Sequence, residues 1–350
     1  MRVLTRAIAI FGALIALTGC NEPGFPAHLK AETVSENGFQ ALLVTPRTNE
    51  PLNTVLILGG SQGGYGSVAT AQKLAEAGFA ALAVAYFGEP GLPQSLNSIP
   101  LEYFDAAIDY IDRNPRLHRN TCDQVPVLGA SRGAELALLL ASVKSAYGPV
   151  VAIAPSSHVW GAIGDSSSPA WTFAGAPITY VPRHSAPDYD VERFVGRDYF
   201  AEDLRHPDAV PAQIAVEDIA GQILLISGTD DRLWPGDEMA DSIVARLQAH
   251  GKARLVQHLK YEGAGHAISP GDPAAATEVS LSGGQTIVLG GSEAANRQAQ
   301  DNSWPVIEQL LRDPVCRMDP VVVAPARDVI TAVEVAAQAQ PSAAQAEVNK

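Results

Sequence analysis

Ser131 stands at the centre of the pattern GASRG at residues 129–133, between the apolar run QVPVL and the helix-forming run AELALLLAS. A serine on a sharp turn between a strand and a helix presents its hydroxyl to substrate. The turn is so tight that side chains at Gly129 and Gly133 would collide. The pattern predicts a nucleophilic Ser131 that carries out acyl transfer.

A second match to the pattern, GGSQG at residues 59–63, follows the run TVLIL. We reject Ser61 as the nucleophile because glycines continue to Gly66, so no helix begins directly after this turn. The G-x-S-x-G pattern resembles the nucleophile elbow of α/β-hydrolases, and that fold keeps its oxyanion loop on such an earlier strand. We therefore expect the backbone N–H of Ser61 or Gln62, together with that of Arg132, to hold an oxyanion.

The same fold places its acid and then its histidine after the serine. The strand-like run QILLIS leads into the turn GTDD, where either aspartate could serve. The G-x-x-D spacing favours Asp231, and leaves Asp230 as a turn carboxylate or a helix cap. His266 follows the last predicted strand in the glycine-rich loop EGAGH, which is the placement that a general base needs. We expect His158 to line the substrate pocket, with an ordinary lid residue as the alternative.

Apolar runs and amphipathic stretches alternate along the chain and predict an α/β fold with a mostly parallel, doubly wound sheet. We expect strands at 39–45, 54–58, 79–86, 124–128, 150–154, 222–227 and 253–260, and helices at 67–77, 101–113, 132–143, 236–249 and 296–311. Residues 158–219 interrupt this rhythm and predict a lid or cap after the strand that follows the nucleophile helix. Residues 283–291 could form a small hairpin.

The chain has 350 residues with 24 Lys+Arg and 38 Asp+Glu, a net charge of −14. This acidic balance argues against a nucleic-acid partner. Three cysteines cannot form a disulfide framework or a four-thiolate zinc site, and serine chemistry needs neither metal nor organic cofactor. We expect Cys122 and Cys316 at the same end of the sheet, either bonded to each other or as two separate buried thiols.

The first residues have the composition of an export signal. Arg2 and Arg6 flank the start of the apolar run AIAIFGALIAL, which is too short to span a bilayer. The LTGC tetrapeptide that ends at Cys20 resembles the bacterial lipobox, which implies cleavage before Cys20 and its lipidation; a plain secretory signal is the alternative. We expect a signal peptide at 1–19, a lipidated tether at 20–37, a catalytic domain at 38–318 and a disordered tail at 319–350. The location expected is the bacterial cell envelope, with membrane contact through Cys20.

Four segments carry a closer resemblance: LEYFDAAIDYIDRNP, GASRGAELALLLAS, ISGTDDRLWPGDEMADSIVARLQAHGK and EGAGHAI. They resemble the C-terminal catalytic domain of acyl-CoA thioesterases and of bile acid-CoA:amino acid N-acyltransferase, over roughly residues 54–311. The resemblance implies Ser131, Asp231 and His266 as a catalytic triad. Family members usually carry an N-terminal β-sandwich domain, for which residues 21–53 are too short.

The function expected from these features is hydrolysis of an ester or thioester of a hydrophobic acyl group through an acyl-serine intermediate. In the family a cysteine nucleophile accompanies transfer to an amine, so the serine favours hydrolysis. An acyltransferase with an amine or lipid acceptor, and a non-catalytic envelope lipoprotein that retains the fold, remain the alternatives. The sequence leaves the oligomeric state open.

Overall fold

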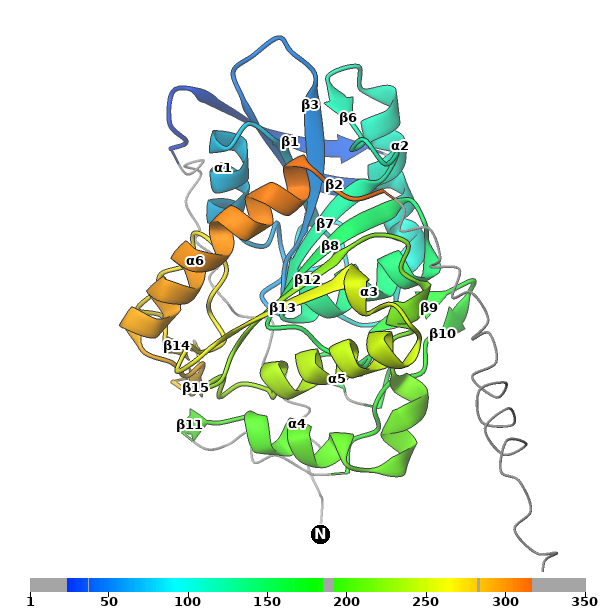
Figure 1. The fold of residues 1–350 in the computed structure, drawn as a ribbon, viewed down its shortest axis with the longest axis vertical. Coiled ribbons are helices and arrows are strands. Elements are labelled where there is room, and N and C mark those ends of the chain that lie inside the picture. The colour runs from blue at the N-terminus through cyan, green and yellow to red at the C-terminus, as the bar shows by residue number, and fades with distance from the viewer. Residues whose placement is uncertain (1–23, 37, 166, 185–191, 282–283, 317–350) are drawn as a thin grey trace, which may run out of the picture. The chain divides into compact units, whose positions relative to one another are not determined.

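The structure is a computed structural model, and it describes residues 24–316 except 37, 166, 185–191 and 282–283 (Figure 1). The expected signal peptide, Cys20 and the tail at 319–350 lie outside the described residues. None of the helices in the described ranges is long and apolar enough to cross a membrane.

A nine-stranded sheet forms the centre of the fold, in the order β1-β2-β4-β3-β7-β8-β12-β13, with a short β6 beside β3. From β4 to β13 the neighbouring strands pair in parallel, whereas β1 and β2 add an antiparallel edge. The strands are β1 (Leu29–Glu36), β2 (Phe39–Pro46), β3 (Leu52–Leu58), β4 (Ala80–Ala85), β6 (Leu117–His118), β7 (Val125–Ala130), β8 (Tyr147–Ile153), β12 (Ile223–Gly228) and β13 (Val256–Tyr261). Every residue of β4, β8 and β12 is buried, as expected for parallel strands covered on both faces.

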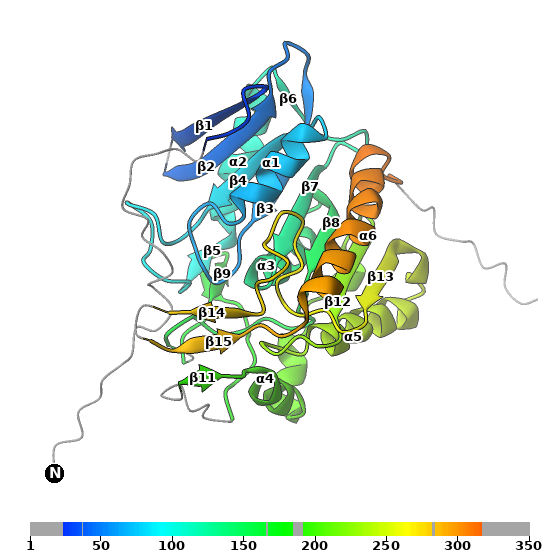
Figure 2. The same ribbon diagram turned by 90° about the vertical axis from the view of Figure 1, so that its left-hand side faces the viewer.

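Helices cover both faces of this sheet, which confirms the doubly wound α/β fold. α1 (Val68–Glu76) and α6 (Glu293–Arg312) lie on one face, and α2 (Asp105–Arg113), α3 (Arg132–Val143) and α5 (Gly236–Ala249) lie on the other (Figure 2). The apolar stripe of each helix decides its side. Leu74 and Ile307 pack into the core with Ile57, while Leu136 and Ile243 join the opposite core.

The predicted cap lies between β8 and β12. It holds β9 (Trp171–Phe173), β10 (Ala176–Pro177), β11 (Arg193–Phe194), α4 (Arg197–Leu204) and 3-10 helices at Pro207–Ala212 and Val216–Asp218. β9 pairs with β10 and with β5 (Ile99–Pro100), whereas β11 joins β15 (Thr286–Val288), which pairs with β14 (Glu278–Ser280). The cap is therefore tied to the chain both before and after it in sequence.

Several predicted boundaries need correction. The helix expected at 296–311 begins at Glu293, and the first turn of the helix expected at 101–113 is a 3-10 turn at Leu101–Phe104. β1 lies inside the segment expected to be a tether, and its eight residues all pair with β2, so ordered structure begins before residue 38. The last strand of the sheet begins at Val256, because Ala253–Leu255 form a 3-10 turn. The hairpin expected at 283–291 is β14–β15, which starts at Glu278.

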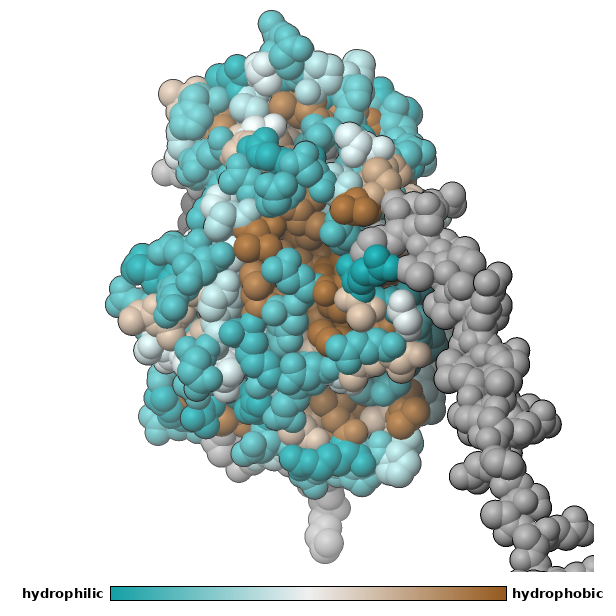
Figure 3. All heavy atoms as spheres, in the orientation of Figure 1, coloured by the Kyte–Doolittle hydropathy of each residue, from teal (hydrophilic) through white to brown (hydrophobic). Residues whose placement is uncertain are grey.

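The edge strand β13 leaves apolar surface beside it. Figure 3 shows an apolar area in the middle of this face, where α6, β13 and α5 meet. Leu259 of β13 and Val306 and Leu310 of α6 are among the partly buried side chains packed on the core in these elements. A last strand of a sheet has a neighbour on one side only, which explains this partial burial.

A disulfide joins Cys122 and Cys316, with a Cα–Cα distance of 4.8 Å and a sequence separation of 194 residues. Cys122 precedes β7 and Cys316 follows α6, so both lie at the end of the sheet opposite the carboxyl end of β7. Of the two alternatives for these cysteines, the bonded one is correct. The bond ties the end of the last described helix to the start of the strand that leads to Ser131.

Candidate active site

Ser131 occupies a strained turn between β7 and α3. Its φ of 56° and ψ of −122° are unusual for a residue with a side chain, and such strain is typical of functional sites. A Cβ on Gly129 would approach the carbonyl oxygen of Gly133 to 2.0 Å, and one on Gly133 would approach that of Leu58 to 2.1 Å. The two glycines of the pattern are thus required by the backbone itself, as the sequence predicts.

Asp231 and His266 form a hydrogen-bonded pair. The Nδ1 atom of His266 lies 2.7 Å from Oδ2 of Asp231, whose side chain is 1% exposed. Oδ1 of Asp231 accepts hydrogen bonds from the backbone N–H groups of Leu233 at 2.9 Å and Trp234 at 3.1 Å. Both carboxylate oxygens are therefore held in place. The bond at Nδ1 leaves Nε2 as the imidazole nitrogen free for proton transfer.

Asp230 has different partners from its neighbour. Its Oδ1 accepts from Nε of Arg232 at 2.6 Å, and its Oδ2 accepts from the backbone N–H of Gly291 at 3.0 Å. It therefore joins two turns and does not contact His266. The structure thus places Asp231, the aspartate favoured by turn spacing, against the imidazole.

The loop after β13 holds His266 through contacts that the sequence analysis missed. The backbone N–H of His266 donates to the carbonyl oxygen of Leu289 at 3.0 Å, and that of Gly265 donates to Oδ1 of Asn296 at 2.8 Å. The Trp234 ring packs edge-on against the imidazole at 5.6 Å between centroids. A tryptophan three residues after the acid and a buried asparagine in the first turn of α6 were the available signals.

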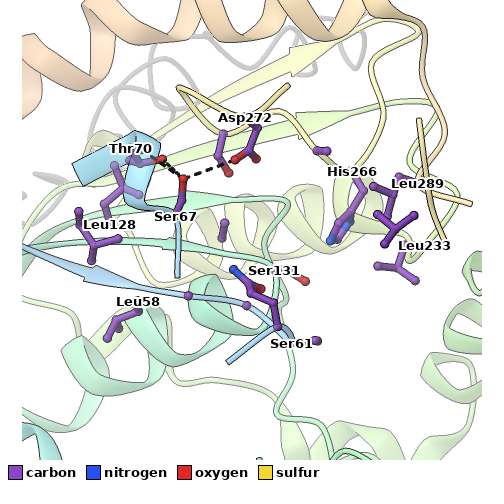
Figure 4. A pocket seen from close by; sticks show the side chains of 18 of the residues that line it. Leu58, Ser61, Ser67, Thr70, Leu128, Ser131, Leu233, His266, Asp272 and Leu289 are labelled. Carbon is purple, nitrogen blue, oxygen red and sulfur yellow. Dashed lines mark hydrogen bonds between the residues drawn. The ribbon is translucent and has the colours of Figure 1, made fainter. Parts of the chain in front are cut away.

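Ser131 and His266 line one cavity of about 260 Å³, together with Ser61 and Gln62 (Figure 4). This volume lies just below the usual range of ligand pockets, about 300–1,000 Å³. The aliphatic lining residues are Ile57, Leu58, Leu128, Ala130, Leu233, Ala267, Val279, Ile287 and Leu289. A serine hydroxyl and an imidazole at the wall of a small apolar cavity suit an acyl substrate.

Backbone N–H groups are available beside Ser131. Within the described residues, no hydrogen bond uses the backbone N–H of Ser61, Gln62 or Arg132. A Cβ on Gly60 would lie 3.2 Å from Cβ of Ser131, so the loop after β3 touches the turn that carries the serine. Free N–H groups next to a nucleophile are the elements of an oxyanion hole.

The side chain of Arg132 forms a buried ion pair with Glu135 at 3.2 Å. The guanidinium also donates to the carbonyl oxygens of Trp160 and Gly161 at 3.1 Å, while Oε1 of Glu135 accepts from Trp160 N–H at 3.1 Å and from Trp171 Nε1 at 2.8 Å. Burial lowers the pKa of Arg132 and raises that of Glu135, and their mutual attraction opposes both shifts. The pair joins the first turn of α3 to the cap.

His158 differs from expectation, because it is not among the residues that line this cavity. Its side chain is buried at 6% exposure, and its Nδ1 lies 2.8 Å from Oγ of Ser157. The backbone at His158 pairs with that of Gln213 in the cap. Burial, together with the charge of Arg246, lowers the pKa of His158 to about 4. This histidine is a neutral packing residue.

One group in the described ranges brings metal-ligand atoms together: His184, His206 and Asp208, within 4.8 Å of one another. The two imidazole rings stack at 3.7 Å with 11° between their planes. Lone pairs in parallel ring planes do not converge on one ion, so this arrangement does not form a metal centre. The pocket lining holds no comparable ligand set.

Comparisons with known proteins agree with this fold. The family model for the C-terminal domain of BAAT and acyl-CoA thioester hydrolases matches residues 99–315. Acyl-coenzyme A thioesterase 6 of Homo sapiens is 29% identical over 310 residues, which cover 85% of this chain and 68% of that protein. The peroxisomal succinyl-coenzyme A thioesterase of Mus musculus is 30% identical over 285 residues, 78% of this chain and 63% of that protein.

A relative named as an amino acid N-acyltransferase is similar to almost the same degree. Acyl-coenzyme A amino acid N-acyltransferase 1 of Mus musculus is 28% identical over 293 residues, which cover 81% of this chain and 65% of that protein. The chain thus spans about two thirds of the length of these relatives. A solved dienelactone hydrolase-like promiscuous phosphotriesterase from metagenomic libraries has a TM-score of 0.50 at 16% identity, covering 81% of this chain and 98% of that one, which supports the hydrolase fold alone.

The matched residues include the strained serine turn, the Asp231–His266 pair and the helices that support them. This chain therefore belongs to the BAAT/acyl-CoA thioester hydrolase C-terminal family.

Proposed function

We propose that this protein is a serine hydrolase that cleaves an ester or thioester of a hydrophobic acyl group through Ser131, Asp231 and His266. One observation carries the proposal: Ser131, on its strained turn, and His266, bonded to Asp231, line the same apolar cavity. The thioesterase relatives favour a thioester, and the modest cavity volume favours a short or medium acyl group.

In the proposed reaction, Nε2 of His266 takes the proton of Ser131 as Oγ attacks the carbonyl carbon. The backbone N–H of Arg132 and that of Ser61 or Gln62 donate to the oxyanion, while Asp231 stabilises the imidazolium. The imidazolium then protonates the leaving alcohol or thiol, and the acyl-serine ester remains. Water activated by His266 hydrolyses that ester and regenerates the hydroxyl.

We also propose that the protein acts in the bacterial cell envelope, anchored through a lipidated Cys20. The Cys122–Cys316 disulfide supports this location, because disulfides persist in oxidising compartments and are rare in the cytosol. An envelope enzyme would meet esters or thioesters of lipid origin. CoA itself is therefore one candidate carrier among several.

Fluorophosphonate labelling followed by a substrate screen tests the proposed function. We expect the mature protein to label at Ser131 and to hydrolyse one class among acyl-CoA, p-nitrophenyl and phospholipid esters. Ser131→Ala should lower kcat/KM by roughly 10⁴-fold or more. Ser61→Ala is the matched control, since Ala keeps the backbone N–H and should cost far less. If Ser61→Ala lost activity and Ser131→Ala kept it, the assignment of the nucleophile to Ser131 would be wrong.

The same labelling separates the alternative functions. A non-catalytic lipoprotein would take up no probe at Ser131. An acyltransferase would label, yet would yield an amide or a new ester in place of the free acid when amine or lipid acceptors are added. The N-acyltransferase relative makes amine acceptors the first to be tried.

A further inference from the structure

Besides Ser61, Gln62, Ser131 and His266, four further polar residues line the cavity and form a polar wall. Ser67 and Thr70 from the start of α1 and Ser269 and Asp272 from the loop after His266 line it. Oγ of Ser67 lies 3.5 Å from Oδ1 of Asp272 and 2.8 Å from Oγ1 of Thr70, which donates to the carbonyl oxygen of Pro270 at 2.7 Å. Figure 4 shows Ser67, Thr70 and Asp272 together, on the other side of the cavity from Leu233 and Leu289.

Among the residues that the structure describes, Asp272 is the only carboxylate that lines the cavity, and no lysine or arginine lines it. The residue is half-buried. Burial raises the pKa of Asp272, against hydrogen bonds from Ser269 and Ser67 and the charge of His266. An anionic group on a substrate would therefore meet another acid at this wall and find no lysine or arginine beside it.

We propose that Ser67, Thr70 and Asp272 form a subsite for a hydrogen-bond donor, such as a hydroxyl, on the acyl group of the substrate, and that this subsite rejects acyl groups ending in a carboxylate. The inference rests on the proposed function and narrows its substrate class. A carboxyl oxygen and two hydroxyls provide acceptors for a hydroxyl donor, and an apolar chain would make no hydrogen bond with them.

The position of the polar wall indicates that it contacts the acyl group of the substrate and not the leaving group. Ser67 and Thr70 line the cavity together with Leu128 of β7, which Figure 4 shows near Thr70. Leu233 and Leu289 lie on the side of His266, which must deliver its proton to the leaving atom (Figure 4). The polar wall is therefore the one that faces the retained acyl chain.

A purely structural role would have Asp272 join its loop to the start of α1. Ser67 already caps that helix by accepting from the backbone N–H of Thr70 at 3.2 Å. Its contact with Asp272 is 3.5 Å, at the long limit of hydrogen bonding, so a well-placed ligand hydroxyl competes readily for the carboxyl oxygen. If Asp272 had only a structural role, its substitution would change kcat/KM equally for all substrates. If it belongs to a subsite, its substitution changes the ratio of kcat/KM between substrates.

The test compares matched N-acetylcysteamine thioesters: butanoyl with 3-hydroxybutanoyl, and hexanoyl with 3-hydroxyhexanoyl, 6-hydroxyhexanoyl and adipoyl. In the wild type we expect kcat/KM for at least one hydroxyacyl thioester to exceed that of its parent by roughly 10-fold, and adipoyl to fall roughly 100-fold below hexanoyl. Asp272→Leu should abolish the hydroxyl preference. Asp272→Asn should keep it and raise adipoyl hydrolysis by about 10-fold. Asp301→Leu, an exposed site on α6, is the matched control and should change neither ratio.

Equal ratios in wild type and Asp272→Leu would overturn the subsite, as would a wild type that hydrolyses all acyl groups alike. Binding keeps the subsite testable apart from catalysis. Calorimetric titration of Ser131→Ala with hexanamide, 3-hydroxyhexanamide and 6-hydroxyhexanamide should show tighter binding of a hydroxylated ligand, lost on adding Asp272→Leu. Equal binding of all three overturns the subsite. Absence of any hydrolysis that depends on Ser131, with the hydroxyl preference in binding intact, would instead overturn the proposed function alone.

Discussion

At the scale of single residues, two adjacent aspartates have separate tasks. Asp231 holds the imidazole of His266, whereas Asp230 bonds Arg232 and the backbone of Gly291. We expect Asp231→Asn to lower kcat by roughly 10⁴-fold, because an amide can hold the wrong tautomer of His266. Asp230→Asn should cost less than about 10-fold, since it disturbs only a turn. Steady-state kinetics of the two variants decide this, and equal losses would contradict the assignment of the acid.

His158 makes stability depend on pH. Its pKa is about 4 in the folded protein and about 6.5 when unfolded, so the unfolded state binds more protons between these values. Its contribution is complete above pH 6.5 and is lost as the pH falls through about 4. Relative to His158→Asn, the wild type should lose about 2 kcal/mol more unfolding free energy between pH 7.5 and pH 5. Urea titrations at both pH values measure this, and parallel losses would refute a buried neutral His158.

At the scale of elements, α3 has two functions. Its N-terminus presents Ser131, and its first turn anchors the cap through Arg132 and Glu135. Glu135→Leu would leave the guanidinium buried without its partner, which should cost about 3–5 kcal/mol of unfolding free energy. The double variant Arg132→Met/Glu135→Leu should recover part of that loss, because neither charge then remains buried, while the partner groups on Trp160, Gly161 and Trp171 stay without their hydrogen bonds.

Urea unfolding of the single and double variants checks this prediction. The double variant should also keep most of its activity, since Met preserves the backbone N–H proposed to hold the oxyanion. A double variant less stable than Glu135→Leu would show that the two charges do not act as a pair.

At the scale of the whole molecule, the Cys122–Cys316 bond closes a loop of 194 residues between β7 and the end of α6. Closing so long a loop restricts the unfolded chain, and Cys122→Ala/Cys316→Ala should be about 3–5 kcal/mol less stable. Denaturant unfolding measures the loss. Mass measurement after alkylation, with and without reduction, is the control. Two alkylated thiols in unreduced, denatured wild type would contradict the bond.

The proposed anchor gives a second prediction at this scale. In a bacterial host, Cys20→Ser should take up no labelled palmitate and remain a soluble or uncleaved precursor, because the modified sulfur is missing. Fractionation and labelling measure the outcome. Normal membrane retention and labelling of Cys20→Ser would refute lipidation at this residue.

The positions of most helices and strands along the chain could be predicted from the sequence, because the patterns that mark them involve neighbouring residues. The helices 132–143 and 236–249 match their predicted bounds. The signals that mark them are the spacing of apolar residues, the apolar runs of the preceding strands and the glycines around Ser131, and each signal extends over only a few residues. β1 escaped prediction because it is an antiparallel edge strand, stabilised by pairing with β2 more than by its own pattern. The order of Ser131, Asp231 and His266 along the chain likewise pointed to one site before any distance was known.

Only the tertiary structure shows which side chains from distant parts of the chain contact each other. Turn spacing favoured Asp231 without excluding Asp230, and the fold turned only Asp231 toward His266. It enclosed His158 in the base of the cap, away from the cavity lining, and brought Cys122 within bonding distance of Cys316. It also placed Asp272, 141 positions after Ser131, on the wall of the same cavity. Local patterns predict which residues form each element, whereas side-chain environments arise from packing between elements far apart in the chain, which no short-range pattern encodes.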